Sequence, residues 1–320
     1  MADDPLACPD FLAERRYAYG KAAEDDGHWR AAADMFEQAL ERAPDWPPAA
    51  FALGEAREKL GDVDGAAAAF RAAQTADPSD SLGASARLAL LEGARPDALP
   101  AAYVARLFDG YAPRFDAHLK EALAYRGPAL IAAALDEASR AAVVRNAVVD
   151  RVGCPQRGRR QFTSALDIGC GTGLMGEVIR DKVGQLTGID LSPRMVAEAR
   201  ARSVYDDLVV SEALAFLQSS ASGAFDLILA ADAFCYFGDL TRLFTACRRA
   251  LRKAGLLAFS VEAFEGEGFR LKTTMRFAHA PAYVETGARG AGLEPLVMKA
   301  ASTRREAGSD APGLVCVLAP

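Results

Sequence analysis

A glycine-rich turn in the middle of the chain constrains the fold most. Residues 165–168 read Ala-Leu-Asp-Ile, an apolar run of strand length, and residues 169–173 read Gly-Cys-Gly-Thr-Gly. A helical pattern begins at Leu174. Glycine permits a tight turn and lets a ligand touch the backbone, and ligands of open α/β sheets bind at the carboxyl ends of strands. The segment therefore predicts a strand, a ligand-binding turn and a helix in succession.

The residues after this turn alternate between apolar runs and helical stretches. The expected strands are residues 164–168, 185–190, 208–210, 226–231 and 256–261. The expected helices are residues 174–182, 193–203, 212–219 and 239–253. Such alternation is typical of βαβ units with a parallel sheet covered on both faces. Two later runs, residues 293–300 and 313–318, predict an antiparallel hairpin at the edge of the sheet.

The first third of the chain repeats itself with a period of 34 residues. The coinciding pairs are Gly20 and Gly54, Ala22 and Ala56, Gly27 and Gly61, Ala32 and Ala66, Phe36 and Phe70, Ala39 and Ala73, and Pro44 and Pro78. The small residues let paired helices approach, the phenylalanines fill the gap, and the prolines stop each second helix. The pattern resembles the tetratricopeptide repeat, although Arg16 and Ala50 stand where that family has tryptophan. Two repeats need a capping helix, which we expect at residues 81–93.

The spacing of the central glycines indicates the ligand. GxGxG differs from the GxGxxG of dinucleotide folds, and the Lys-Ser/Thr ending of a phosphate-binding loop is missing. Free N–H groups at the start of the next helix favour an anion. A small carboxylate fits better than a pyrophosphate, and S-adenosylmethionine carries one at its methionine end. The next expected strand ends at Asp190, whose carboxylate can accept both hydroxyls of a ribose; a solvated loop carboxylate is the alternative.

These two segments together resemble motifs one and two of the class I S-adenosylmethionine-dependent methyltransferases. The subgroup resembled carries N-terminal tetratricopeptide repeats, and the ubiquinone- and biotin-pathway methyltransferases are similar at more distance. The resemblance implies an α/β fold with a Rossmann-like, seven-stranded, mostly parallel sheet whose last strand is antiparallel. We expect an all-α repeat module at residues 1–94 and a methyltransferase domain at residues 95–320. Within that domain, residues 103–160 would form a helical lid and residues 161–320 the core.

The resemblance also implies a site for S-adenosyl-L-methionine. The residues that it assigns to the cofactor are Tyr111, Asp167, Gly169, Cys170, Gly171, Gly173, Asp190, Leu191, Glu212, Ala213 and Ala231. Asp167 and the glycine turn would shape the methionine pocket, and Asp190 would hold the ribose. Leu191 would lie against the adenine, with Glu212 and Ala213 near the adenine amino group.

Among these residues, Ala231 is assigned to the reacting end of the cofactor, and the assignments of Glu212 and Tyr111 have alternatives. Ala231 would border the sulfonium, because it follows the fourth strand. Glu212 is equally explained as an acid in the first turn of a helix. Tyr111 belongs to a stretch that forms a lid in similar proteins, yet it lies four residues from Phe115, and such a helical pair is often simply packed.

The substrate side is expected after the fifth strand. His279 could remove a proton from the nucleophile, and Arg276 could bind an acidic substrate group bidentately. Tyr236 and Glu262, at strand ends, are further candidates. A packing or surface role is the alternative for each of them. His118 could act as a base, but a satisfied structural histidine explains it as well.

Composition excludes several other classes of protein. The formal net charge is −6 and no basic stripe is present, so we expect no nucleic-acid partner; the basic cluster at residues 157–160 is interpreted as a solvated loop. No apolar run is long enough to span a bilayer, and the acidic N-terminus lacks the features of a signal peptide. The six cysteines are scattered, which favours reduced thiols and a cytoplasmic location. No ligand spacing for a metal is present.

The expected activity is methyl transfer from S-adenosylmethionine to an O, N, S or C nucleophile of a small molecule. The methyl group is already activated, so the protein mainly supplies alignment. No Asn-Pro-Pro-Tyr follows the fourth strand, which argues against adenine or glutamine-amide methylation. The repeat module could bind a protein partner, mediate self-association or act as a structural lid. Two alternatives stay open: a non-catalytic scaffold with a degenerate cofactor domain, and a nucleotide-linked oxidoreductase, which the GxGxG spacing disfavours.

Overall fold

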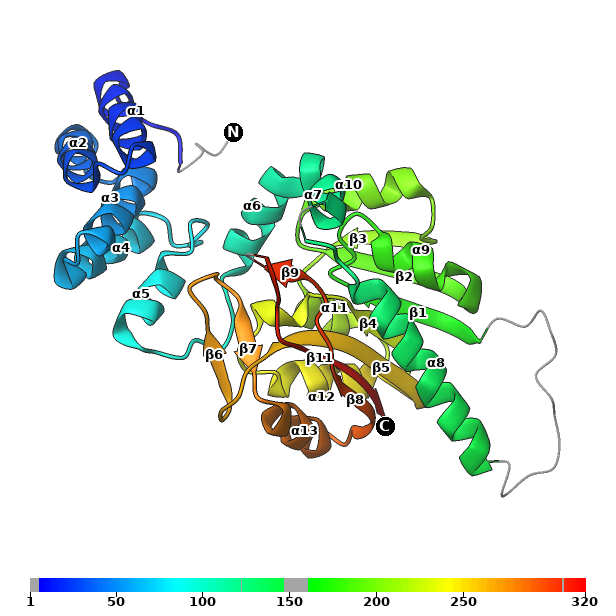
Figure 1. Ribbon diagram of the computed structural model, residues 1–320. Coiled ribbons are helices and arrows are strands. Elements are labelled where there is room, and N and C mark those ends of the chain that lie inside the picture. Colours follow the sequence, from blue (N-terminus) through cyan, green and yellow to red (C-terminus); the bar gives the residue numbers. More distant parts are fainter. Residues whose placement is uncertain (1–5, 122, 147–160, 307) are drawn as a thin grey trace. The chain divides into compact units, whose positions relative to one another are not determined.

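The chain divides into two compact units, Met1–Val104 and Ala105–Pro320. The computed structural model (Figure 1) describes residues 6–121, 123–146, 161–306 and 308–320. The basic cluster at residues 157–160 and the last part of the expected lid, residues 147–160, lie outside the described residues. No helix in the described ranges is long and apolar enough to cross a membrane.

The first unit is a stack of antiparallel helix pairs. Its helices are α1 (Phe11–Asp25), α2 (Trp29–Arg42), α3 (Pro47–Lys59), α4 (Val63–Ala76) and α5 (Ala84–Glu92). Phe36 and Phe70 are fully buried, and a Cβ at Gly54 would lie only 2.6 Å from Cε1 of Phe70. The repeated glycines therefore make room for the repeated phenylalanines. The capping helix expected at residues 81–93 is α5.

The second unit begins with helices that precede a sheet. They are α6 (Ala101–Tyr111), which crosses the boundary between the units, η1 (Ala112–Arg114), α7 (Phe115–Glu121) and α8 (Gly127–Asn146). The strands of the main sheet are β1 (Phe162–Ile168), β2 (Val183–Asp190), β3 (Asp207–Val210), β4 (Phe225–Ala230), β5 (Leu251–Ala263), β8 (Glu294–Ala300) and β11 (Gly313–Ala319). Their spatial order is β3-β2-β1-β4-β5-β11-β8, and β11 is antiparallel to both of its neighbours. The Rossmann-like sheet with an antiparallel last strand is confirmed.

Two details of the sheet differ from the sequence expectation. Residues 293–300 and 313–318 do pair antiparallel, but β11 lies between β5 and β8, so only β8 is at the edge. The helix expected to end at residue 253 ends at Ala250, because Leu251 already pairs with Phe225 of β4 as part of β5. Helical periodicity is a local signal and contains no information about such pairing.

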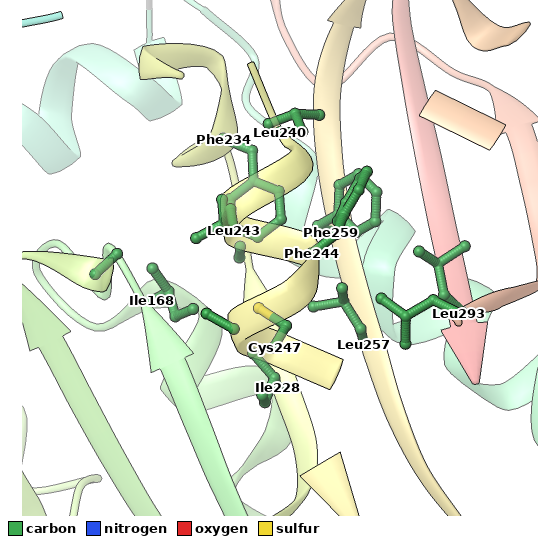
Figure 2. Close-up of a cluster of buried hydrophobic side chains, with 14 of the residues drawn as sticks. Ile168, Ile228, Phe234, Leu240, Leu243, Phe244, Cys247, Leu257, Phe259 and Leu293 are labelled. Carbon is green, nitrogen blue, oxygen red and sulfur yellow. The ribbon is translucent and has the colours of Figure 1, made fainter. Parts of the chain in front are cut away.

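Helices cover both faces of the sheet (Figure 1). The remaining ones are α9 (Leu174–Ile179), η2 (Arg180–Lys182), α10 (Pro193–Arg202), α11 (Ala213–Ser219), η3 (Phe234–Tyr236), α12 (Thr241–Ala250) and α13 (Pro281–Gly290). Helices α8 and α9 pack on one face through side chains such as Leu135 and Ile179. Helices α11, α12 and α13 pack on the other, where Phe244 meets Phe259 and Leu257 of β5 (Figure 2). This burial fixes the strand ends that carry the site.

Short strands extend the sheet beyond the sequence expectation. β6 (Phe269–Leu271) and β7 (Phe277–His279) form a hairpin, and β7 pairs with the last residues of β5, Glu262 and Ala263. A second hairpin, β9 (Arg305–Glu306) with β10 (Ser309–Asp310), lies between β8 and β11 in the chain. Both hairpins bring charged residues to the carboxyl end of β5.

Candidate active site

The glycine turn after β1 is built from left-handed backbone. Gly169, Gly171 and Gly173 have φ values of +67°, +53° and +101°, which side chains other than glycine adopt at a cost. A Cβ at Gly169 would lie 2.6 Å from Cβ of Ala233, so the loop after β4 leaves no space there. The Cys170 N–H donates to the Ile189 carbonyl oxygen at 2.9 Å and ties the turn to β2. The sequence motif therefore forms the expected backbone cradle at the carboxyl end of β1.

Asp190 joins the end of β2 to this cradle. Its Oδ2 accepts the N–H of Gly171 at 2.9 Å, and its Oδ1 accepts the N–H of Ser192 at 2.9 Å. Burial raises the pKa of Asp190, while the N–H groups of Ser192 and Gly171 act in the opposite direction. Each carboxylate oxygen keeps capacity for a further donor. The arrangement can thus accept a pair of ribose hydroxyls beside the glycine turn. Ser192 also caps α10 by accepting the Met195 N–H at 3.0 Å.

Asp167 lies inside β1, directly before the turn, and is fully buried. Its Oδ2 accepts the Tyr205 hydroxyl at 2.7 Å, but its Oδ1 is buried and has no hydrogen-bond partner in the described chain. Burial raises the pKa of Asp167 to about 7. An orphaned buried acceptor is rare in folded proteins. A bound ammonium group, such as the one on the methionine end of S-adenosylmethionine, is a fitting partner for it.

Aromatic residues of α6 and α7 lie over the turn. A Cβ at Gly171 would be 3.7 Å from the Phe115 ring, in ordinary contact. The Phe115 ring meets Tyr111 edge-on at 5.1 Å between centroids, and Phe108 meets Tyr236 edge-on at 5.6 Å. The structure therefore places Tyr111 in an aromatic cover, which consists of Phe108, Tyr111 and Phe115. The Tyr111 hydroxyl also contacts Nδ1 of His118.

Two aspartates fasten this aromatic cover to the cofactor segments. Asp109 accepts the Ser192 hydroxyl at 2.5 Å. Asp116 accepts the Thr172 hydroxyl at 2.6 Å and forms an ion pair with Arg202. Both contacts end on the loops that carry the glycine turn and Asp190, so the cover is held directly over them. The sequence did not single out either aspartate.

The segment expected at the adenine lies at the start of α11. Glu212 is the N-cap of that helix, and its carboxylate accepts the Ala215 N–H at 2.7 Å. The contact agrees with the alternative that Glu212 is an acid at the start of a helix. It also occupies one oxygen of the Glu212 carboxylate. Ala213 is buried and Leu191 is half-buried. These residues stay candidates for the adenine end, as does Ala231 for the reacting end.

A cluster of charged residues stands at the carboxyl ends of β4 and β5. Glu262 is nearly fully buried and accepts Nζ of Lys272 at 2.8 Å, Nη2 of Arg304 at 2.6 Å and Nε of Arg276. Burial alone would raise its carboxyl pKa, but Arg276 and Arg304 lower the pKa of Glu262 to about 2. Asp232 Oδ2 lies 3.2 Å from Nη2 of Arg276 and 3.4 Å from Nη1 of Arg304. We call Asp232, Glu262, Lys272, Arg276 and Arg304 the charged cluster.

Asp232 is held in a costly backbone conformation. Its φ is +59°, a region that non-glycine residues adopt only where the surroundings enforce it, and such residues concentrate at functional sites. Its N–H donates to Oγ of Ser260 at 3.0 Å. The next residue, Ala233, is the one that packs against Gly169. The charged cluster therefore adjoins the glycine turn after β1.

Tyr236 and Arg276, both expected at the substrate side, contact each other. Nη1 of Arg276 donates to the Tyr236 hydroxyl oxygen at 2.8 Å, and the guanidinium lies 5.2 Å from the ring centroid. Burial raises the pKa of Tyr236, so the hydroxyl keeps its proton at neutral pH. Nη2 of Arg276 is buried and makes no hydrogen bond in the described residues.

His279 does not occupy the place expected of a base. The side chain is fully buried, and its Nε2 donates to the carbonyl oxygens of Phe237 at 2.9 Å and Gly238 at 3.1 Å. Burial lowers the pKa of His279 to about 4, and the ring stacks on Tyr283. Nδ1 is also buried and has no hydrogen-bond partner among the described residues, and the enclosed ring, stacked on Tyr283, corresponds to the packing alternative. The sequence pattern indicated its neighbourhood but not its burial.

Sequence reasoning missed Arg304 and Lys272 as site residues, whereas Asp232 lies in the segment after the fourth strand, residues 230–234, that the resemblance places at the sulfonium. Arg304 lies in a segment that looks like a polar turn, and Lys272 lies beyond the fifth strand in a stretch with no strand signal. A buried arginine in such a turn is not part of any hydrophobic periodicity that the sequence shows, so its burial could not be predicted. Groups of three or more metal-type ligands are absent from the residues that the structure describes.

Comparison with known proteins agrees with this geometry. Residues 166–259 match the methyltransferase domain family, and residues 17–81 match the tetratricopeptide repeat family. The chain is 36% identical over 104 residues to a malonyl-[acyl-carrier protein] O-methyltransferase of Enterobacter lignolyticus, covering 32% of this chain and 41% of that protein. It is 32% identical over 98 residues to a ubiquinone biosynthesis O-methyltransferase of Xanthomonas oryzae pv. oryzae, covering 30% and 41%. The chain thus spans about two fifths of the length of these curated relatives.

Solved structures of similar shape include two methyltransferases. One is in the complex between the Haloferax volcanii Trm112 methyltransferase activator and the putative methyltransferase, with 17% identity, coverage of 66% of this chain and 96% of that chain, and a TM-score of 0.46. The other is the 1,6-didemethyltoxoflavin-N1-methyltransferase of Burkholderia thailandensis, with 16% identity, coverage of 70% and 91%, and a TM-score of 0.46.

The strand order, the glycine turn and the acidic end of β2 define the second unit as a class I methyltransferase domain, whose cofactor is S-adenosylmethionine. The chain therefore joins an N-terminal segment that matches the tetratricopeptide repeat family to a segment that matches the methyltransferase domain family.

Proposed function

We propose that the protein transfers a methyl group from S-adenosylmethionine to an oxygen nucleophile of a small molecule. The observation that carries the proposal is the hydrogen bond from the Gly171 N–H to Asp190, which joins the glycine turn to the end of β2. Both residues lie within the segment that matches the methyltransferase domain family. The oxygen acceptor is supported by the curated relatives, which are named O-methyltransferases.

The chain's own residues supply binding and alignment. The backbone of residues 169–173 would hold the methionine carboxylate, Asp167 would receive the ammonium group, and Asp190 would accept the ribose hydroxyls. When bound, the cofactor supplies an activated methyl group on its sulfonium. Phe108 and Phe115 of the aromatic cover would exclude water, which strengthens the polar contacts inside the site. Alignment of the nucleophile is then the main task of the protein.

Calorimetric titration tests the cofactor half of the proposal. We expect S-adenosylmethionine to bind and NAD not to bind. Replacing Asp190→Asn should weaken S-adenosylmethionine binding about tenfold, since one carboxylate oxygen becomes a donor. Asp181→Asn, an exposed change in η2 of the same domain, is the matched control. Binding of NAD alone, or of neither ligand by folded protein, would overturn the proposal.

Incubation with S-adenosylmethionine labelled in its methyl group, together with a fractionated cell extract, tests the transfer half. Label in the small-molecule fraction is the expected result. Label in a protein band would assign a macromolecular acceptor instead. Cofactor binding without any transfer would favour the scaffold alternative.

We also propose that the repeat unit binds a protein partner or a second copy of the chain. The match to the tetratricopeptide repeat family supports an interaction role, and α1 exposes large apolar side chains, Phe11 and Tyr19 among them. Light scattering of the full chain across a concentration series distinguishes these two possibilities. A molecular mass that doubles as the concentration rises supports self-association. A constant monomer mass supports a different protein as the partner.

A further inference from the structure

Two hydrogen-bond donors, the Tyr236 hydroxyl and Nη2 of Arg276 in the charged cluster, stand side by side without hydrogen-bond acceptors among the described residues. The Tyr236 hydroxyl oxygen accepts from Nη1 of Arg276 at 2.8 Å, so its own proton must point elsewhere. No described residue accepts that proton. Nη2 of the same guanidinium is buried without a hydrogen bond, although Asp232 Oδ2 is 3.2 Å away as an ion-pair partner. Buried donors are seldom left unpaired in a finished site, so a ligand is the natural acceptor.

The chemistry of the missing acceptor follows from the donors. A phenolic O–H and a guanidinium N–H next to it match the two oxygens of one carboxylate, in charge-assisted hydrogen bonds. Arg276 cannot turn freely toward another partner, because its Nε donates to Glu262 and Arg304 also contacts that carboxylate. The guanidinium is therefore oriented in advance.

These donors lie next to the cofactor cradle. Asp232, which pairs with Arg276, is followed by Ala233, and Ala233 packs against Gly169 of the glycine turn. Phe108 of the aromatic cover packs edge-on against Tyr236, so the acceptor would enter when this cover moves aside. A group held here would face the methionine end of the cofactor.

A carboxylate acceptor also removes the need for a base. The imidazole of His279 is buried, its Nε2 donates to two carbonyl oxygens, and burial lowers its pKa to about 4, so the histidine beside the cluster is a weak base toward a substrate proton. A carboxylic acid is already ionised near neutral pH. An alcohol would instead have to lose its proton during the transfer.

We propose that the methyl acceptor is a small carboxylic acid, bound by Tyr236 and Arg276 and methylated on its carboxylate. One carboxylate oxygen attacks the methyl carbon and forms the new O–C bond. The S–C bond breaks with its electron pair left on sulfur, so the sulfonium becomes a neutral thioether and no proton moves. The product is a methyl ester. This inference rests on the proposed methyltransferase function and adds its substrate class.

The lability of the product tests the inference. The full chain is incubated with S-adenosylmethionine tritiated in the methyl group and a small-molecule cell extract, and the labelled products are treated with alkali. A methyl ester releases volatile tritiated methanol, whereas methyl ethers and methylamines retain their label. Release of most of the label supports the carboxylate. Label that is stable to alkali overturns the carboxylate acceptor but is consistent with the proposed methyltransferase function. Absence of label, with intact binding of S-adenosylmethionine, overturns both the carboxylate acceptor and the proposed function.

Substitutions test the two donors. Arg276→Lys keeps the positive charge but loses the planar guanidinium, which can donate two parallel hydrogen bonds. We therefore expect the KM of the labelled acceptor to rise at least about tenfold. Tyr236→Phe should raise it about threefold. The affinity for S-adenosylmethionine should change by less than about twofold in both variants, which shows that they fold. Arg289→Lys, an exposed residue of α13, is the control. An unchanged KM in both variants, or a loss confined to kcat, would overturn the binding role.

Discussion

The cofactor side and the acceptor side of the site are built in different ways. The cofactor side uses mostly backbone: three glycines in left-handed conformation and one carboxylate that ties two loops together. The acceptor side uses side chains from separate segments, and Arg304 reaches Asp232 across 72 positions of the chain. The glycine turn requires backbone dihedral angles that favour glycine and room for the backbone without a side chain. The charged cluster instead requires that its buried ions neutralise one another. The two sides should therefore respond to different perturbations.

The largest expected effect is on the acceptor side, from Glu262→Gln. The change leaves buried arginines short of a counter-ion, which costs about 3–5 kcal/mol of unfolding free energy. Glu294→Gln, an exposed change in β8, should cost less than about 0.5 kcal/mol. Urea unfolding at pH 7 measures both. Equal stability of the two variants would mean that the charged cluster contributes little to the fold.

The same residue predicts an acid-dependent stability. The pKa of Glu262 is about 2 in the folded protein against 4.5 for the free group, so its contribution is fully present above about pH 4.5. It is lost as the pH falls toward 2, because the folded state must then take up a proton against its ion pairs. Unfolding free energy measured between pH 5 and 3 should fall less steeply in Glu262→Gln than in the natural chain. Parallel slopes would contradict the depressed pKa.

The next largest effect is on the cofactor side and compares two glycines with the same φ of +67°. Gly169→Ala adds a Cβ 2.6 Å from Ala233, whereas Gly223→Ala meets nothing nearer than 3.9 Å. Both pay the backbone cost of about 1–2 kcal/mol. Only the first should weaken S-adenosylmethionine binding, by about 100-fold. Calorimetry decides, and matching affinities would show that the cradle tolerates a side chain.

A smaller effect is expected from pH through Asp167. Its pKa of about 7 in the absence of ligand means that the carboxyl loses its proton as the pH rises from 6 to 7.5. If it receives the ammonium group, S-adenosylmethionine binding should tighten several-fold over that interval. Asp167→Asn should abolish the dependence, and Asp181→Asn should retain it. A flat profile in the natural chain would assign Asp167 to packing alone.

The smallest effect concerns the aromatic cover. Asp116→Asn removes the charge that pairs with Arg202 at a partly exposed position, where ion pairs contribute about 0–1 kcal/mol. S-adenosylmethionine should dissociate about threefold faster in stopped-flow experiments. An unchanged rate would mean that α7 does not gate the cofactor.

What could be predicted from the sequence follows the same division. The glycine turn, Asp190 and the paired helices of the repeat unit depend on neighbours in sequence or on a fixed period, so their residues carry a readable pattern. The charged cluster does not, because Arg304 and Glu262 are 42 positions apart in the chain and are brought together by long-range strand pairing, with β11 between β5 and β8. His279 shows the same limit. Its position after the fifth strand suggested chemistry, but only packing decides whether an imidazole faces a substrate or the core.

The most direct measurement is a crystal structure of the protein with S-adenosylhomocysteine. The account predicts the amino-acid tail against the main chain of residues 169–173, with both ribose hydroxyls about 3 Å or less from the Asp190 carboxylate. A ligand bound elsewhere, or Asp190 turned away from the sugar, would contradict it.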